Sequence, residues 1–412
     1  MVVATRIYPP EQAAAAFRLG ALVQALESRA AQVTVLTTRS GGSGPAAVSN
    51  TRTRLSRWPV LRDRSGAVRG YLPYLSFDLP LILRTLVVPR PDVVVVEPPP
   101  TTGAVVRAVL SARAALSTQR RSVPYVYYAA DVWSDASAAT GAPRAVVSAL
   151  GSLERFALEG ASQVIAVSDG VAERVRALGA RSVQVVPNGV DARVFTPDPS
   201  RAWPGPTPSV EGIPPGPFLL YAGTASEWQG AEIFAEAMGE VVRHYPDATL
   251  VFLGQGSAWP RLRRIAESAP KGAVELHPLV APPVAAAWHR AAVAALVSVR
   301  PGLDYDFAYP TKVLAALACG TPVIYAGPGP AADDLHRDHL GTAVPYDREA
   351  VAAAMTQALG AASEPLEANR RAQWVRRHRS IGATAQTAAE IVLTAAAAPG
   401  EGSPRPRFGA RS

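Results

Sequence analysis

The chain has 412 residues, of which 48% are hydrophobic and 18% charged, so its length suits two domains of ordinary size. The formal net charge is +8, but the basic residues are scattered and form no run interleaved with aromatic residues. This disfavours a nucleic-acid partner and leaves an anionic substrate or an anionic membrane surface. The single cysteine, Cys319, excludes an intrachain disulfide and a cysteine-ligated metal cluster.

The amino-terminal sequence MVVATRIYPPEQ lacks a basic segment before an apolar core, so we expect no signal peptide and a cytoplasmic protein. The most apolar early window, Tyr71 to Pro89, is interrupted by Asp78, Pro80 and Arg84 and is too short to span a bilayer. An ordinary surface helix is the favoured interpretation of segment 58–90. Peripheral contact with the inner face of the membrane stays open.

Short apolar runs alternate with helical patterns through the first half of the chain. The predicted strands are 2–5, 33–37, 92–96, 125–128, 163–167 and 183–186. The predicted helices are 11–29, 102–116, 145–159 and 168–178. This order requires parallel strands joined by helical crossovers. The nearly continuous apolar run at 92–96 indicates a strand covered on both faces.

The alternation restarts after residues 197–216, which are rich in Pro, Gly and Ser and are typical of a linker. The predicted strands of the second half are 217–222, 249–253, 274–276, 294–299 and 322–325. Helices are predicted at 231–244, 284–291, 311–318, 350–359 and 366–397. One more helix is predicted after Gly254-Gln255-Gly256 and ends at about Arg264.

The predicted fold class is therefore α/β, with two Rossmann-like doubly wound domains that face a cleft. The predicted parts are an N-terminal domain 1–196, a linker 197–216, a C-terminal domain 217–375, a C-terminal helix 376–397, and a disordered tail 398–412. Ligands bind such sheets at the carboxyl ends of the strands, so we expect the site in the cleft.

Lys312 stands at the predicted start of a helix, where a positive charge opposes the helix dipole. Thr311 is predicted to cap this helix through its hydroxyl. Free backbone N–H groups and an ammonium at one point favour a bound anion. Only Lys271 and Lys312 among the 41 basic residues are lysines, which favours a phosphate-binding role over an ordinary exposed side chain.

Two glycine-containing turns follow predicted strands of the second half, Gly223-Thr224 and Gly254-Gln255-Gly256. Glycine there lets a ligand approach the backbone, although a tight turn explains the same residues equally well. These two turns and the helix start at Thr311-Lys312 would lie at one edge of the second sheet. Together they predict a nucleotide site.

Two carboxylates end predicted strands of the first half. Asp131 is a candidate to bind or deprotonate an acceptor hydroxyl, with a helix or turn cap as the favoured alternative. Glu97 faces the same sheet edge, with a solvated loop residue as its alternative. The histidines form no tight pair of the kind that binds zinc, so no metal site is predicted.

These features together resemble the GT-B glycosyltransferases of family 4 over nearly the whole chain. The motifs that resemble the family are Tyr8-Pro9-Pro10-Glu11, Asp131-Val132-Trp133, Ala166-Val167-Ser168, Pro187-Asn188-Gly189-Val190-Asp191, Gly254-Gln255-Gly256, Pro310-Thr311-Lys312 and Ala318-Cys319-Gly320-Thr321-Pro322-Val323-Ile324. The resemblance implies a nucleotide-sugar donor held mainly by the C-terminal domain, retention of anomeric configuration, and no metal or other cofactor. It also implies that the C-terminal helix, 376–397, packs back on the N-terminal domain.

The resemblance also implies roles for single residues. Lys312 would lie beside the donor diphosphate, Leu279 near the base, and Asp131 near the acceptor and the anomeric carbon. Glu97 and Glu11 are expected on the acceptor side. Gly223, Thr224, Gly254, Asp306 and Thr311 complete the expected donor site.

The chain also departs from the family pattern. Gln12-Ala13-Ala14 stands where members usually carry a glycine pair. Ala315 replaces the second of two glutamates, the one on the ribose hydroxyls, and Phe307 replaces the first. Asp304 and Asp306 are candidates to substitute for the first glutamate, and no residue is identified that substitutes for the second. Thr224 and Gln229 lie where many members place Arg and Lys.

Three functions follow as hypotheses. The first is a retaining glycosyltransferase that moves a sugar, with a UDP-sugar favoured as donor, to a hydroxyl of a small-molecule or lipid-linked acceptor in surface-glycan or secondary-metabolite biosynthesis. The second is a non-catalytic homologue that is a partner or regulator of an active glycosyltransferase. The third is a sugar-nucleotide 2-epimerase, for which the carboxylate and His constellation is not found.

Overall fold

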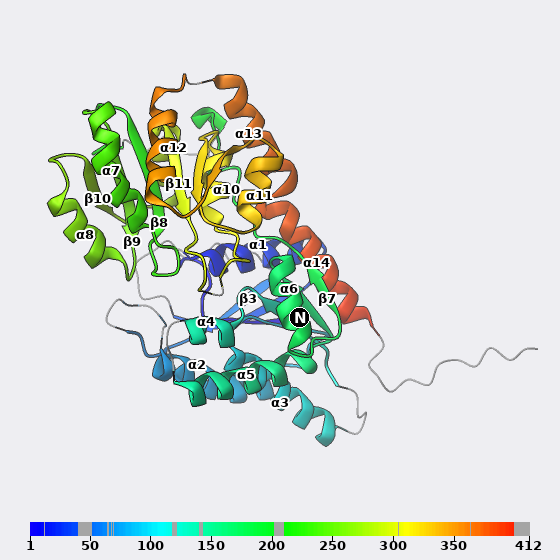
Figure 1. The fold of residues 1–412 in the computed structure, drawn as a ribbon. Coiled ribbons are helices and arrows are strands. Elements are labelled where there is room, and N and C mark those ends of the chain that lie inside the picture. Colours follow the sequence, from blue (N-terminus) through cyan, green and yellow to red (C-terminus); the bar gives the residue numbers. More distant parts are fainter. Residues whose placement is uncertain are drawn as a thin grey trace, which may run out of the picture. The chain divides into compact units, whose positions relative to one another are not determined.

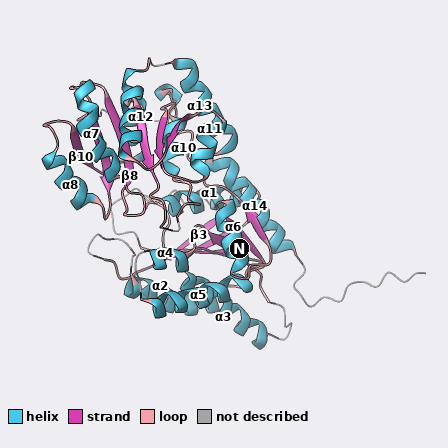
Figure 2. Ribbon diagram, viewed as in Figure 1, coloured by secondary structure: helices cyan, strands magenta, loops and turns pink. Residues whose placement is uncertain are grey.

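The computed structural model describes residues 1–398 except 12, 40–51, 64–65, 67, 69, 118–121, 140–142, 202–209, 304 and 363. The chain forms two compact units, one from Met1–Pro187 with Ala385–Ser412 and one from Asn188–Thr384. Each unit is built around one parallel sheet with helices on both faces (Figures 1 and 2). The predicted fold class, two Rossmann-like α/β domains, is confirmed.

The first unit has a seven-stranded sheet in the order β3-β2-β1-β4-β5-β6-β7, in which every pair is parallel. The strands are β1 (Val2–Ala4), β2 (Val33–Thr38), β3 (Thr53–Trp58), β4 (Val94–Val96), β5 (Tyr125–Ala129), β6 (Gln163–Ala166) and β7 (Val183–Val185). The order reverses between β1 and β4, so the carboxyl ends of these two strands mark the switch point, where α/β sheets bind ligands.

Helices cover this sheet on both faces. They are α1 (Ala14–Ser28), α2 (Tyr71–Val87), α3 (Pro100–Leu116), α4 (Trp133–Ala139), α5 (Arg144–Glu159), α6 (Asp169–Ala177) and, from Ala385 on, α14 (Ile381–Ala397). Helices α2, α3 and α5 lie side by side on one face, and α1 and α14 lie on the other (Figure 1). Arg29 at the end of α1 forms a 2.8 Å ion pair with Glu390 on α14.

The second unit has a six-stranded parallel sheet in the order β10-β9-β8-β11-β12-β13. Its strands are β8 (Phe218–Thr224), β9 (Thr249–Gln255), β10 (Val274–Pro278), β11 (Ala294–Ser298), β12 (Val323–Ala326) and β13 (Gly341–Val344). Its helices are η1 (Pro199–Arg201), α7 (Glu232–His244), α8 (Trp259–Ser268), α9 (Pro282–Ala291), α10 (Thr311–Ala318), α11 (Pro330–Arg337), α12 (Arg348–Gly360) and α13 (Pro365–His378).

Apolar side chains from both faces of the second sheet form its core. On one face Tyr221, Phe234 and Phe252 pack with residues of α7 and α12. On the other face Val313 and Leu317 of α10 pack against β11 and β12. The strand order of this sheet reverses between β8 and β11. Since α10 follows β11 in the chain, the first turn of α10 lies at this switch point.

The division between the units falls at Pro187, earlier in the chain than the predicted boundary at 196. The backbone N–H of Val190 donates to the Arg379 carbonyl at 2.9 Å, and the N–H of Ile381 donates to the Val190 carbonyl at 2.9 Å. These bonds attach the segment after Pro187 to the second unit.

Within the predicted linker 197–216, residues 202–209 lie outside the described residues, and Val210 and Ile213 pack against the core around Phe218 and Trp288. The predicted tail 398–412 lies outside the described residues from 399 on. The segment 366–397 is helical as predicted, but it is divided into α13 and α14, and the break lies a few residues after the predicted start of the C-terminal helix at 376. The chain leaves α13 at Arg379 and starts α14 at Ile381, because residues 379–381 pair with Val190.

Candidate functional site

Helix α10 begins without a side-chain cap, and this corrects the prediction for Thr311. Pro310 occupies the N-cap position with extended backbone angles, and no side chain accepts a hydrogen bond from the first turn. Thr311 is the first helical residue instead. Proline at the cap fixes the chain direction but has no side-chain acceptor. The positive end of the helix dipole is therefore not neutralised by a cap.

Lys312 lies on this first turn and folds over the end of β8. Its Nζ is 5.4 Å from the centre of the Tyr221 ring, within reach of a cation–π contact. The side chain is half-buried, and desolvation lowers the pKa of its ammonium to about 7. Among the described residues no carboxylate forms an ion pair with Lys312. An anion at this point would compensate the desolvated charge.

The backbone of β8 and β9 explains the glycines beside Lys312. Gly223 has a φ of +115°, and a Cβ there would lie 3.1 Å from Lys312 Cε. A Cβ at Gly254 would lie 2.1 Å from the Gly223 carbonyl oxygen. The close approach of the β8 backbone therefore requires glycine at Gly254, which lies within β9 and pairs with Gly223. Gly223 instead leaves room for the lysine side chain.

The predicted donor residues of the second unit lie in register across its sheet edge. Gly223 pairs with Gly254, and Gly254 pairs with Pro278 on the next strand. Thr224 and Leu279 each follow one position later, and both side chains are exposed. The structure thus brings Gly223, Thr224, Gly254 and Leu279 to the same edge as the first turn of α10.

Asp306 lies in the loop between β11 and α10, with an exposed side chain. Its carbonyl oxygen faces Gly329 at the start of α11, where a Cβ would lie 2.2 Å away. The backbone of Asp306 therefore has a packing role, and its carboxylate remains accessible at the carboxyl edge of the sheet.

Aromatic stacking joins the loop after β8 to the loop after β11. The Trp228 and Tyr305 rings stack with centroids 4.7 Å apart and planes 15° apart. The N–H of Arg300 donates to the Trp228 carbonyl at 2.9 Å. Gln229 is buried and its side-chain oxygen accepts from the Ser226 N–H at 3.1 Å. These contacts hold both loops beside Lys312, and the sequence carried no signal for the stacked pair.

In the first unit, Asp131 follows β5 and precedes α4. The favoured alternative for Asp131 is a helix or turn cap, and the helix-cap part of it is not observed, because Glu154 from α5 takes that role for α4. The backbone N–H groups of Trp133 and Ser134 donate to the Glu154 carboxylate at 2.8 and 3.0 Å. Glu154 was not predicted, since it lies far from α4 in sequence and only the packing of α5 brings it there.

The Asp131 carboxylate is exposed and its pKa is raised to about 6. Desolvation is the main cause, Arg18 lowers the pKa, and the negative charges of Glu97 and Glu154 raise it. Because the side chain is accessible, solvent screens part of these effects, and the net direction of the pKa shift is upward. A carboxylate with a raised pKa, without an ion pair among the described residues, suits proton transfer.

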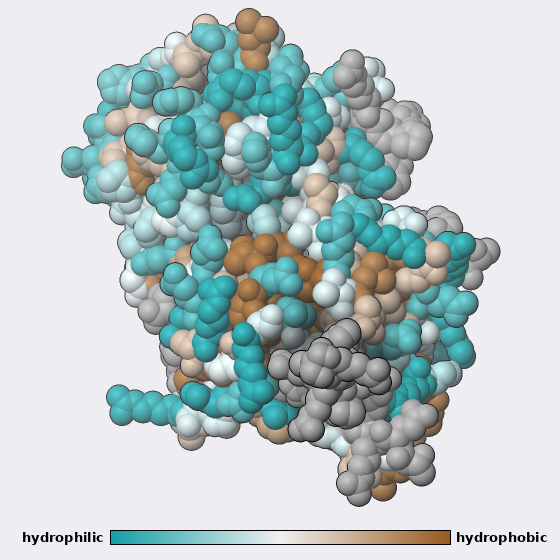
Figure 3. Space-filling model, turned by 90° about the vertical axis from the view of Figure 1, so that its right-hand side faces the viewer, coloured by the Kyte–Doolittle hydropathy of each residue, from teal (hydrophilic) through white to brown (hydrophobic). Residues whose placement is uncertain are grey.

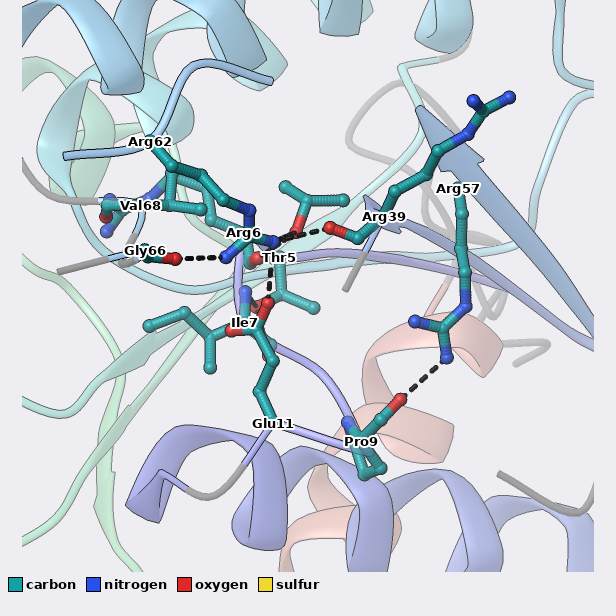
Figure 4. Close-up of polar contacts among 11 residues, drawn as sticks. Thr5, Arg6, Ile7, Pro9, Glu11, Arg39, Arg57, Arg62, Gly66 and Val68 are labelled. Atoms are coloured by element: carbon teal, nitrogen blue, oxygen red, sulfur yellow. Dashed lines mark hydrogen bonds and ion pairs between the residues drawn. The ribbon is translucent and has the colours of Figure 1, made fainter. Parts of the chain in front are cut away.

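Glu97 and Glu11 are both paired with arginines. Glu97 is buried, forms an ion pair with Arg18, and accepts from the Thr5 hydroxyl at 3.3 Å, so the alternative of a solvated loop residue is wrong. Glu11 forms a 2.8 Å ion pair with Arg62 (Figure 4). The two carboxylates predicted on the acceptor side are therefore engaged by arginines, whereas Asp131 forms no ion pair among the described residues.

In the described part of the chain, no three His, Cys, Asp or Glu side chains gather closely enough to hold a metal ion. No described helix is both long enough and apolar enough to cross a membrane.

The sequence and the fold are similar to those of known proteins. The family model Glycosyltransferase Family 4 matches residues 16–194, and the model Glycosyl transferases group 1 matches residues 216–361. A D-inositol 3-phosphate glycosyltransferase of Paenarthrobacter aurescens (strain TC1) is 34% identical over 146 residues. That match covers 34% of this chain and only 33% of the relative.

Solved structures are similar over nearly the whole chain. Sucrose-phosphate synthase from Thermosynechococcus elongatus has a TM-score of 0.71 and 17% identity, covering 95% of this chain and 98% of that chain. HepE from Anabaena, solved in complex with UDP and glucose, has a TM-score of 0.64 and 15% identity, covering 95% and 99%. Such identities show the fold alone. Together with the two family models, which follow one another along the two units, they show that the chain belongs to the GT-B glycosyltransferases of family 4, a family of enzymes.

Proposed function

We propose that this protein is a retaining glycosyltransferase that moves a sugar from a UDP-sugar to a hydroxyl of an acceptor in surface-glycan or secondary-metabolite biosynthesis. The observation that carries the proposal is Lys312, a half-buried ammonium over Gly223, on a helix start that has no side-chain cap. A donor diphosphate would neutralise this charge and accept hydrogen bonds from the first-turn N–H groups. The complexes of HepE with UDP and with UDP-glucose support the choice of nucleotide.

The proposed chemistry needs no metal ion. Negative charge develops on the diphosphate as the sugar leaves, and preorganised positive groups stabilise that charge. Lys312 and the dipole of α10 are these groups in the described chain. Asp131 would bind or deprotonate the acceptor hydroxyl, because its accessible carboxylate has a raised pKa and forms no ion pair among the described residues. We propose a small-molecule or lipid-linked acceptor.

Titration calorimetry with UDP, GDP and dTDP, without added metal, tests the donor site. We expect micromolar binding of UDP, and we expect Lys312→Ala to weaken it by roughly tenfold or more, the loss of one charge-assisted contact. Lys271→Ala is the matched control, because Lys271 is an exposed lysine outside the site. Equal affinity in the Lys312 and Lys271 variants would remove the proposed role of Lys312.

A non-catalytic homologue remains the second candidate, and the replacement of a family glutamate by Ala315 favours it. If none of the three nucleotides binds, this second function is supported. If UDP binds, NMR analysis of the product formed from a UDP-sugar reports whether the anomeric configuration is retained.

A further inference from the structure

Hydrophobic residues gather in areas of the surface between hydrophilic ones (Figure 3). The largest concentration of exposed apolar side chains lies on α2. Eight of the sixteen large hydrophobic side chains that are exposed among the described residues belong to this helix: Tyr71, Leu72, Leu75, Leu79, Ile82, Leu83, Leu86 and Val87. Leu79 is 61% exposed and Leu83 is 54% exposed. A patch of this kind on a protein surface marks an interaction site.

The polar side chains of α2 point the opposite way. Asp78 is 2% exposed and accepts hydrogen bonds from the Thr101 and Thr102 hydroxyls, each at 2.6 Å. Arg84 is 3% exposed and donates to the Thr37 carbonyl at 3.2 Å. Every exposed residue of α2 is Tyr, Leu, Ile or Val. The helix therefore has the reverse of the polarity that a helix facing water normally has.

An arginine flanks this apolar face on the neighbouring edge strand. The Ser56 hydroxyl of β3 contacts Arg84 at 3.3 Å, so Ser56 faces α2. Residues two positions apart on a strand share a face, which places exposed Arg54 and Trp58 on the same side. Arg52, which precedes the strand, instead donates to the Glu27 carbonyl of α1 at 3.4 Å. The described exposed residues of β3 and α2 include no carboxylate.

We propose that α2, together with Arg54 of β3, binds the surface of an anionic membrane. The apolar side chains would enter the outer acyl region, and Arg54 would contact lipid phosphates. Trp58 and Tyr71, both exposed, suit the headgroup level. A twofold contact with a second copy is disfavoured, because the same patch would face itself and bring like charges together. This surface does not depend on the proposed sugar transfer.

Co-sedimentation with vesicles tests the proposal on the full chain. We expect binding to phosphatidylcholine vesicles that contain phosphatidylglycerol, weaker binding to pure phosphatidylcholine, and a decrease with added salt. The double variant Leu79→Gln/Leu83→Gln should reduce the partition coefficient by on the order of tenfold or more, because two exposed leucines lose their apolar contact with lipid. Leu366→Gln, at an 84% exposed leucine of α13 in the second unit, is the matched control.

The charge of Arg54 is tested separately. Arg54→Gln should lower binding to anionic vesicles by roughly fivefold and leave binding to phosphatidylcholine unchanged. Arg52→Gln is the matched control, because the Arg52 guanidinium donates to the Glu27 carbonyl of α1. Unchanged melting temperatures show that the variants fold. Absence of wild-type binding, or equal binding of the double variant and the Leu366 control, would overturn the proposal. A wild-type dimer that dissociates in the double variant would instead assign the face to a second copy.

Discussion

Lys312 lies against Gly223, so that a Cβ on this glycine would come within 3.1 Å of Lys312 Cε and 3.8 Å of Nζ. The two residues come from the start of α10 and the end of β8, which meet at the switch point of the second sheet. The absence of a side chain at Gly223 therefore determines where the ammonium lies.

Gly223→Ala tests this relationship. The new methyl group would displace Lys312, so we expect UDP affinity to fall by roughly tenfold. The φ of +115° also strains alanine and should cost about 1 kcal/mol of unfolding free energy. Gly272→Ala is the control, because Gly272 has a φ of +83° and a Cβ added there would meet no atom within 4 Å. Calorimetry should show weaker binding in the Gly223 variant alone.

The pH dependence of UDP affinity reports the charge of Lys312. Desolvation lowers the pKa of the free ammonium to about 7, and a bound diphosphate would raise it. Above about pH 7, binding must therefore take up a proton, and affinity should fall as the pH rises toward about 9. Lys312→Arg should abolish this slope, because a guanidinium stays charged throughout. A wild-type affinity that is constant over this range would contradict the assignment.

Asp131→Asn should lower turnover strongly while UDP affinity stays constant, because the amide cannot accept a proton. In the wild type, activity should fall as the pH drops through about 6, where Asp131 becomes protonated. Asp135→Asn is the control. Asp135 lies on α4 and pairs with Arg174 at 2.6 Å, and breaking such a surface pair should cost at most about 1 kcal/mol. Equal turnover in the two variants would exclude a catalytic role for Asp131.

Glu154→Gln tests the effect of the Glu154 charge on the pKa of Asp131 separately from the role of Glu154 as the cap of α4. The amide keeps one oxygen for the N–H groups of α4 but removes a negative charge that raises the pKa of Asp131. The acid limb of the activity profile should therefore move to lower pH. Glu154→Ala should in addition lower the unfolding free energy by about 1–3 kcal/mol, because three donors lose their acceptor. Chemical denaturation measures this loss, and an unshifted acid limb in Glu154→Gln would contradict the electrostatic coupling.

Most strands and helices could be predicted, because they depend on local apolar runs and helical spacing. The apolar run at 92–96 predicts a buried strand, and the strand found there, β4, is fully buried. The strand β3 was missed, since its arginines interrupt the apolar pattern and it pairs only with β2 at the sheet edge. Asp78 and Arg84 interrupted the pattern of α2 in the same way, yet both side chains point inward.

The sequence by itself determined the alternation of strands and helices, the family, and the position of Lys312 at a helix start, because each of these depends on residues close together in the chain. Tertiary structure decided which side chains remain available. Glu154 caps α4, arginines neutralise Glu97 and Glu11, and Asp131 keeps an accessible carboxylate. These outcomes depend on contacts between residues far apart in sequence, whose pairing is settled only when the sheets and helices pack.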